Sequence, residues 1–138
     1  MDDHDLERFV AAQAGTYDQA LTELKAGAKR SHWMWFVFPQ IAGLGQSAMA
    51  RAYGIGSIAE ARAYLAHPVL GGRLREASAA VLAAPGTAEA IMGGIDAVKP
   101  RSSMTLFARA AGEDGAAFRA VLDRFYGGQE DAETVRRL

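Results

Sequence analysis

The segment from residue 29 to 40 constrains the fold most, because it reads Lys-Arg-Ser-His-Trp-Met-Trp-Phe-Val-Phe-Pro-Gln. It holds both tryptophans and two of the six phenylalanines of the chain. A helix would spread these rings around its axis, and a strand would place them on both faces, so other elements must cover the segment either way. We favour a short buried helix that ends at Pro39, because no second strand pattern occurs elsewhere to pair with a strand.

The rest of the chain follows helical spacing almost throughout and is interrupted by glycine and proline. Ser57 to Glu60 forms a capping box, which predicts a helix from there to about Ala66. We therefore expect an all-α protein, an irregular multihelical bundle of about six to eight short helices around one core, in a single domain over residues 1–138. The cleanest apolar stripe comprises Phe118, Val121, Leu122 and Phe125.

Composition and charge narrow the class of protein. Half of the 138 residues are hydrophobic and 22% are charged, which is typical of a soluble globular domain. The net charge of −1 argues against a general nucleic-acid binder. The chain has no cysteine, so disulfides and zinc–thiolate sites are excluded. Without a secretory start or an apolar run of about 20 residues, we expect a cytoplasmic protein that does not enter a membrane.

A first candidate cluster opens the aromatic segment. Lys29 could neutralise a phosphate or carboxylate, and His32 could transfer a proton near neutral pH. Trp33 or Trp35 could stack on a flat group. The alternative is structural: the rings form the core, Ser31 caps a helix and His32 hydrogen-bonds a backbone carbonyl.

A second cluster combines Asp96 and Lys99 with hydroxyl side chains that precede or open a predicted helix from about Ser103 onward. A helix N-terminus has free backbone N–H groups and favours an anion, and Lys99 would add positive charge. The alternative is that Ser102 or Ser103 is only the N-cap and that Lys99 pairs with Asp96. The hydroxyl residues are Ser102, Ser103 and Thr105.

A third cluster lies at a predicted helix–helix corner around Tyr64, His67 and Arg73. Arg73 could reach a buried carboxylate or a ligand anion. His67, just before Pro68, is more typical of a helix end. Gln40, outside this corner, could fix a ligand or a loop carbonyl.

Several chemical motifs are missing from the sequence. It has neither the phosphate loop G-x-x-x-x-G-K-[ST] nor the G-x-G-x-x-G fingerprint nor an H-E-x-x-H helix. His4, His32 and His67 are far apart in the chain. The sequence therefore predicts neither a metal site nor a cofactor.

The string from Ser31 to Gln40, followed by Gly43-Leu44-Gly45, resembles a family of small bacterial proteins known as domain of unknown function 1810, sometimes labelled calpastatin in genomes. The resemblance implies an all-helical fold and no settled activity. It covers most of the chain and continues through Tyr64-Leu65, His67-Pro68, Arg73-Leu74, Lys99, Ser102 to Phe107 and Phe125 to Gly128.

Two functional hypotheses follow. In the first, the three clusters converge on a pocket for a small anionic, flat ligand, such as a nucleotide or an ADP-ribose-like compound, with His32 as candidate catalytic acid or base. Hydrolysis of such a ligand is compatible with this role, although no motif supports it, and whether the chain is an enzyme stays open. This hypothesis predicts that His32, Arg73 and Ser103 surround one cavity. The alternative is a non-enzymatic protein-interaction module with no small-molecule site and an unknown protein partner.

Overall fold

The computed structural model describes residues 4–138, which form α-helices joined by loops. These residues contain no strand, only an isolated bridge between Ile41 and Ile55, so the expected all-α, irregular multihelical fold is confirmed. In chain order the helices are α1 (Glu7–Gln13), α2 (Tyr17–Ala26), α3 (Met34–Val37), α4 (Ala48–Ala52), α5 (Ile58–Ala66), α6 (Leu70–Ala83), α7 (Ala88–Met92), α8 (Lys99–Ala111), the 3-10 helix η1 (Gly112–Gly115), α9 (Ala116–Tyr126) and α10 (Ala132–Arg136).

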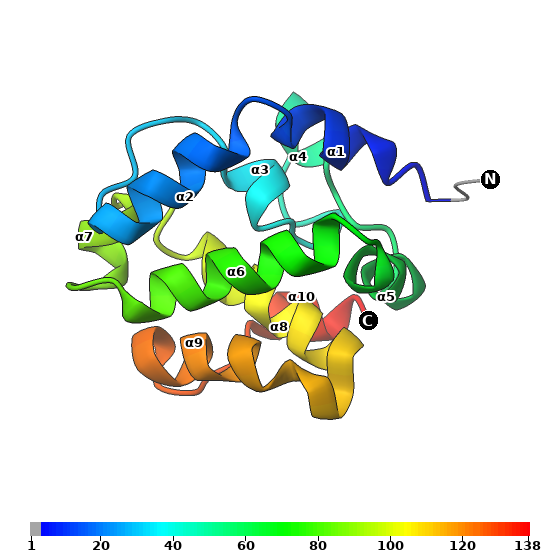
Figure 1. Ribbon diagram of the computed structural model, residues 1–138. Helices are drawn as coiled ribbons and strands as arrows, with labels where there is room; N and C mark the ends of the chain where they lie inside the picture. The colour runs from blue at the N-terminus through cyan, green and yellow to red at the C-terminus, as the bar shows by residue number, and fades with distance from the viewer. Residues whose placement is uncertain (1–3) are drawn as a thin grey trace.

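Helix α6 runs through the middle of the molecule, between α2 on one side and α9 on the other (Figure 1). Its buried residues Leu74, Ala77 and Val81 recur every three or four positions, which places them on one face of the helix. Helix α8 packs against α9 and α5, and α10 returns against α8. None of the described helices is long and apolar enough to cross a membrane.

The aromatic segment is a short buried helix, as its composition predicts. Trp33 and Phe38 are fully buried on either side of α3, and Phe36 inside α3 is also buried. Trp35 differs from these residues, because it is only partly buried and packs at the edge of the core. The structural interpretation therefore holds for most of the segment, and Trp35 is the ring left at the surface.

Helix α8 begins earlier than its sequence suggests. It starts at Lys99 rather than near Ser103, and the residue before it, Val98, makes no capping hydrogen bond through its side chain. Pro100 lies in the first turn, where a missing N–H leaves no helical hydrogen bond unmade. The interpretation of Ser102 or Ser103 as an N-cap is therefore wrong, because both lie inside the helix and are buried.

Side chains cap several other helix starts, and two of these test the predictions. Ser57 accepts a hydrogen bond from the backbone N–H of Glu60 at 3.1 Å, so the Ser57 half of the predicted capping box is present at the start of α5, while the Glu60 carboxylate accepts from the backbone N–H of Gly56 at 3.1 Å. At the start of α6, His67 Nδ1 accepts hydrogen bonds from the backbone N–H groups of Val69 and Leu70, at 3.1 and 3.3 Å. The structural interpretation of His67 is thus the one that the structure supports.

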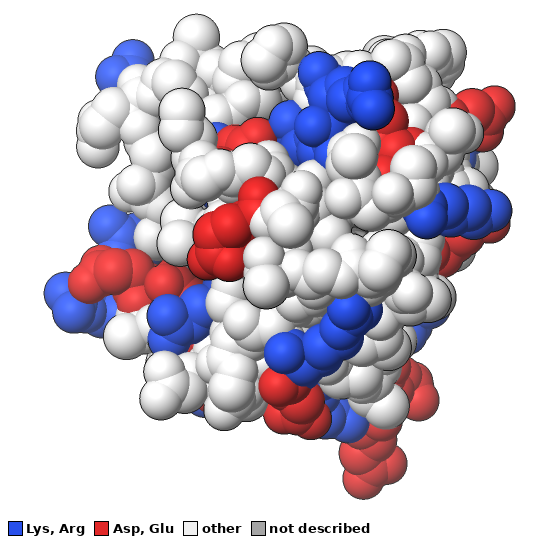
Figure 2. Space-filling view, turned by 90° about the vertical axis from the view of Figure 1, so that its left-hand side faces the viewer, with Lys and Arg blue, Asp and Glu red and all other residues white. Residues whose placement is uncertain are grey.

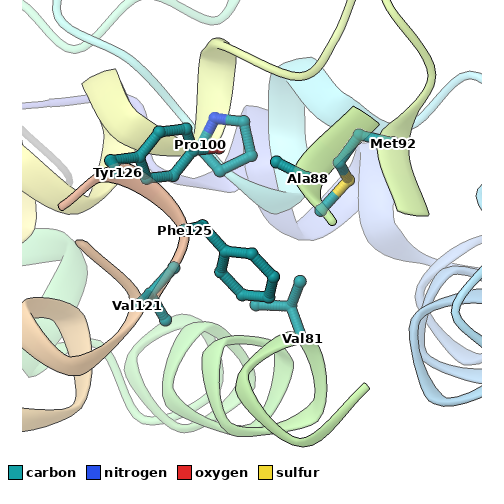
Figure 3. A pocket seen from close by; sticks show the side chains of 7 residues that line it. All are labelled: Val81, Ala88, Met92, Pro100, Val121, Phe125 and Tyr126. Atoms are coloured by element: carbon teal, nitrogen blue, oxygen red, sulfur yellow. The ribbon is translucent and has the colours of Figure 1, made fainter. Parts of the chain in front are cut away.

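Apolar side chains from α6, α7, α8 and α9 converge on one another (Figure 3). The space between them is too small for a water molecule. This small gap between the side chains is therefore part of the packed core rather than a ligand site. The converging residues are Val81, Ala88, Met92, Pro100, Val121, Phe125 and Tyr126.

Candidate functional site

Two open pockets meet at Trp35 and Lys99, which line both of them, and we call the pair the Trp35–Lys99 site. The first pocket has a volume of about 270 Å³ and the second about 290 Å³. The first is also lined by Lys29, His32, Met34, Ile95 and Asp96. The second is also lined by Gln40, Leu44, Gly45, Val98, Ser102, Asp131 and Glu133.

A carboxylate shared by two lysines forms one wall of the first pocket. Asp96 Oδ1 lies 2.7 Å from Lys99 Nζ, and Asp96 Oδ2 lies 2.9 Å from Lys29 Nζ. Burial would raise the pKa of Asp96, but hydrogen bonds and positive charge from the two lysines hold it below its usual value. The side chain of Lys29 is only 6% exposed and that of Lys99 is 19% exposed, so Lys99 is the cation that a ligand reaches more easily.

Lys99 also lies against the aromatic wall. Its Nζ stands 4.0 Å from the centre of the Trp35 ring, within the range of a cation–π interaction. The predicted pairing of Lys99 with Asp96 is therefore confirmed, and it orients the cation over the ring. The result is a flat apolar surface with a positive charge on its face, at the junction of the two pockets.

The backbone on either side of His32 is held by a buried carboxylate, Glu23 of α2. Glu23 Oε1 accepts from the backbone N–H groups of Arg30 and Ser31 and from Trp33 Nε1, at 2.8, 3.0 and 2.9 Å. Glu23 Oε2 accepts from the Ser31 hydroxyl at 2.6 Å. Burial opposes ionisation, yet these hydrogen bonds lower the pKa of Glu23 to about 2.

Glu23 explains two of the predicted site residues. The Ser31 hydroxyl donates to Glu23, and Ser31 neither caps a helix nor lines either pocket. Trp33 is buried and hydrogen-bonded to the same carboxylate, so it supports the site from the core and does not contact a ligand. Glu23 is not among the site residues predicted from the sequence. Its position three residues after Ala20, on the buried face of α2, could have indicated it.

His32 is exposed and lines the first pocket. Within residues 4–138 its side chain makes no hydrogen bond, so the alternative of a bond to a backbone carbonyl is not realised. Free ring nitrogens at the edge of a pocket are available to a ligand.

The second pocket offers hydrogen-bonding groups of a different kind. The side chains of Gln40 and Ser102 line it and have no partner among the described residues. Asp131 lines it as well, but its Oδ2 caps α10 by accepting from the backbone N–H of Thr134 at 3.0 Å. Thr105 does not line the pocket; its hydroxyl accepts from the backbone N–H of Asp131 at 2.9 Å and so ties α10 to α8.

The third predicted cluster lies elsewhere. Tyr64 is fully buried and accepts a hydrogen bond from Gln13 at 3.1 Å. Arg73 donates to Gln13 at 3.2 Å and stacks over Tyr17. Tyr64, His67 and Arg73 line neither pocket.

The prediction that His32, Arg73 and Ser103 surround one cavity is therefore wrong. Helix α6 directs Arg73 toward α1 and α2. Ser103 is fully buried, its hydroxyl has no partner among the described residues, and it lines neither pocket. Two of the three clusters meet at the Trp35–Lys99 site, the one around residues 29–35 and the one around 96–102.

Comparisons with known proteins support the resemblance seen in the sequence. A family model described as "Protein of unknown function (DUF1810)" matches residues 3–138. The crystal structure of the conserved hypothetical protein Rv1873 from Mycobacterium tuberculosis is 52% identical in sequence, with a TM-score of 0.96 over 99% of this chain and 98% of that chain. No curated protein matches the chain. The chain therefore belongs to the DUF1810 family of proteins of unknown function.

Proposed function

We propose that the Trp35–Lys99 site binds a small, flat, anionic metabolite, such as a nucleotide or an ADP-ribose-like compound. The observation that carries the proposal is the position of Lys99, whose ammonium group lies on the Trp35 ring and lines both pockets. An aromatic surface paired with a cation suits a ligand that combines a planar group with a negative charge.

Different side chains around the site would bind different parts of the ligand. The anionic group would bind Lys99, with His32 at the edge of the first pocket as a further donor. The planar group would lie against Trp35, and hydroxyl groups would reach Gln40 and Ser102, whose side chains have no partner in residues 4–138. Buried or partly buried polar groups without partners gain most from a ligand that satisfies them.

The proposal concerns binding rather than a reaction. His32 is the candidate acid or base because it is exposed in the pocket. No hydroxyl nucleophile is hydrogen-bonded to it within the described chain, so the geometry does not define a hydrolytic step.

Calorimetric titration with AMP and ADP-ribose tests the proposal. We expect Lys99→Met to weaken binding by about tenfold or more, because it removes the accessible charge while keeping the length of the side chain. Trp35→Leu should also weaken binding by removing the ring surface. Lys25→Met is the matched control, because Lys25 is exposed on α2 and lines neither pocket. Equal affinities in Lys99→Met and Lys25→Met would contradict the proposal.

The alternative of a protein-interaction module draws on two exposed apolar side chains that line the two pockets. Ile95 is 87% exposed and Val98 is 66% exposed, which is unusual for residues of this size. If Ile95→Asp abolished a complex isolated with the unmodified protein while a panel of nucleotides failed to bind, this alternative would replace the proposal.

A nucleic-acid partner receives little support. On the face shown in Figure 2, lysine and arginine side chains are interspersed with aspartate and glutamate rather than gathered in one basic surface. A nucleic-acid interface needs a continuous basic patch.

A further inference from the structure

The Asp96 carboxylate already occupies the place that an anionic ligand needs. Each of its two oxygens contacts a different lysine, at 2.7 Å for Lys99 and 2.9 Å for Lys29. A ligand anion that bound Lys99 with full strength would have to share it with Asp96 or replace the carboxylate. Asp96 is thus an internal competitor for the charge on which binding depends.

We propose that Asp96 competes with the ligand for Lys29 and Lys99, so that the site retains groups carrying two negative charges, of which the phosphate monoester is the chemical class, and binds singly charged groups only weakly. The inference rests on the proposed function, because it concerns the same Lys99.

The physical reason is the charge balance of the exchange. Replacing one carboxylate by another singly charged anion returns the lysines to the same electrostatic environment, and the ligand must still lose its hydration. A phosphate monoester carries a charge of about −1.5 to −2 at neutral pH, so it attracts the two ammonium groups more strongly than Asp96 does. A phosphodiester, with one charge, has no such advantage.

The segment that carries Asp96 has space to move outward. Gly93 and Gly94 precede it, both are exposed, and no other side chain or backbone lies within 4 Å of a Cβ placed on either. Ile95, next to Asp96, is 87% exposed, whereas Ala97 on the other side is buried and its backbone oxygen accepts from the Tyr126 hydroxyl, so an outward movement with little loss of packing is confined to the residues before Ala97. On the other side the backbone oxygen of Asp96 accepts from the Lys99 N–H at 3.1 Å, which anchors the segment to α8.

The test compares AMP, a phosphate monoester, with 3′,5′-cyclic AMP, a phosphodiester that carries the same base. Calorimetry near pH 8 should give AMP an affinity at least about fivefold higher in the unmodified protein, the effect of one extra charge near a partly exposed cation. In Asp96→Asn the competitor loses its charge, so both nucleotides should bind more tightly and cyclic AMP should bind measurably. Equal binding of the two ligands by the unmodified protein, or a cyclic AMP affinity that Asp96→Asn fails to raise, would overturn the inference.

The measurement on the unmodified protein keeps the test decisive even if Asp96→Asn folds poorly. Lys99→Met distinguishes a failure of the inference from a failure of the proposed function. If both nucleotides bind equally and Lys99→Met weakens both, the inference fails and the proposed function stands. If neither nucleotide binds, or if Lys99→Met affects neither, the proposed function fails and the inference fails with it.

Discussion

At the scale of single residues, one buried carboxylate organises the segment that leads into the site. Glu23 accepts hydrogen bonds from two backbone N–H groups, an indole and a hydroxyl, all within residues 30–33. Such a carboxylate stabilises the fold only while it is ionised. His32 owes its position to it, because Glu23 holds the residues on either side of His32, whereas the Lys29 backbone N–H donates to the Ile91 backbone oxygen at 2.7 Å.

Glu23 therefore predicts a pH dependence of stability. Its pKa is lowered to about 2 in the folded protein, against about 4.3 for an unperturbed glutamate in the unfolded chain. The sign is that of a depressed acid: the stabilisation is present above about pH 4.3 and is lost as the pH falls toward 2. Urea unfolding from pH 5 to pH 2 should show a smaller decrease in the free energy of unfolding for Glu23→Gln than for the unmodified protein. Identical decreases would contradict this role.

At the scale of elements, α5 and α6 approach closely at a glycine. A Cβ on Gly71 would lie 2.0 Å from the backbone oxygen of Leu65, which is shorter than any tolerable contact. The next residue, Gly72, is exposed and has open space around the same position. Two neighbouring glycines of one helix therefore have opposite roles, one in packing and one without a contact that requires it.

Substitution by alanine should separate them. Gly71→Ala should lower the free energy of unfolding by about 1–3 kcal/mol or more, because backbone must move to admit the methyl group. Gly72→Ala should raise it by about 0.5–1 kcal/mol, since alanine favours a helix over glycine. Thermal unfolding of both variants measures the difference. A stabilising Gly71→Ala would show that α5 and α6 are not in this contact.

At the scale of the whole molecule, Gln13 joins four helices. Its Nε2 donates to the Phe36 backbone oxygen at 2.7 Å and to the Tyr64 hydroxyl at 3.1 Å, and its Oε1 accepts from Arg73 at 3.2 Å. These groups come from α3, α5 and α6, whereas Gln13 ends α1. Gln13 thus fixes a junction between helices.

Gln13→Met should destabilise the protein by about 1–3 kcal/mol, because it keeps the size of the side chain but leaves buried polar groups without partners. Gln129→Met, at an exposed position, should change the free energy of unfolding by less than about 0.5 kcal/mol. Combining Gln13→Met with Tyr64→Phe should cost less than the sum of the two changes, since each removes the same hydrogen bond. Strict additivity in urea unfolding would argue against the junction.

The sequence by itself determined the fold class, the burial of most of the aromatic segment and local signals such as the Ser57 cap and the Lys99–Asp96 pair. These features depend on residues close together in the chain, so spacing and side-chain chemistry suffice to predict them. The sequence predicts too late a start for α8, because proline usually interrupts a helix. Proline is also tolerated in a first helical turn, which is where Pro100 lies.

Only the tertiary structure decided which polar residues meet. It brings Trp35 and Lys99 together from segments far apart in the chain, and it turns Arg73 toward α1 and α2. The rotation of each helix around its axis sets these outcomes, and that rotation depends on the packing of all its neighbours rather than on local sequence. The sequence therefore named the residues of the candidate site, whereas the packing of the helices selected among them.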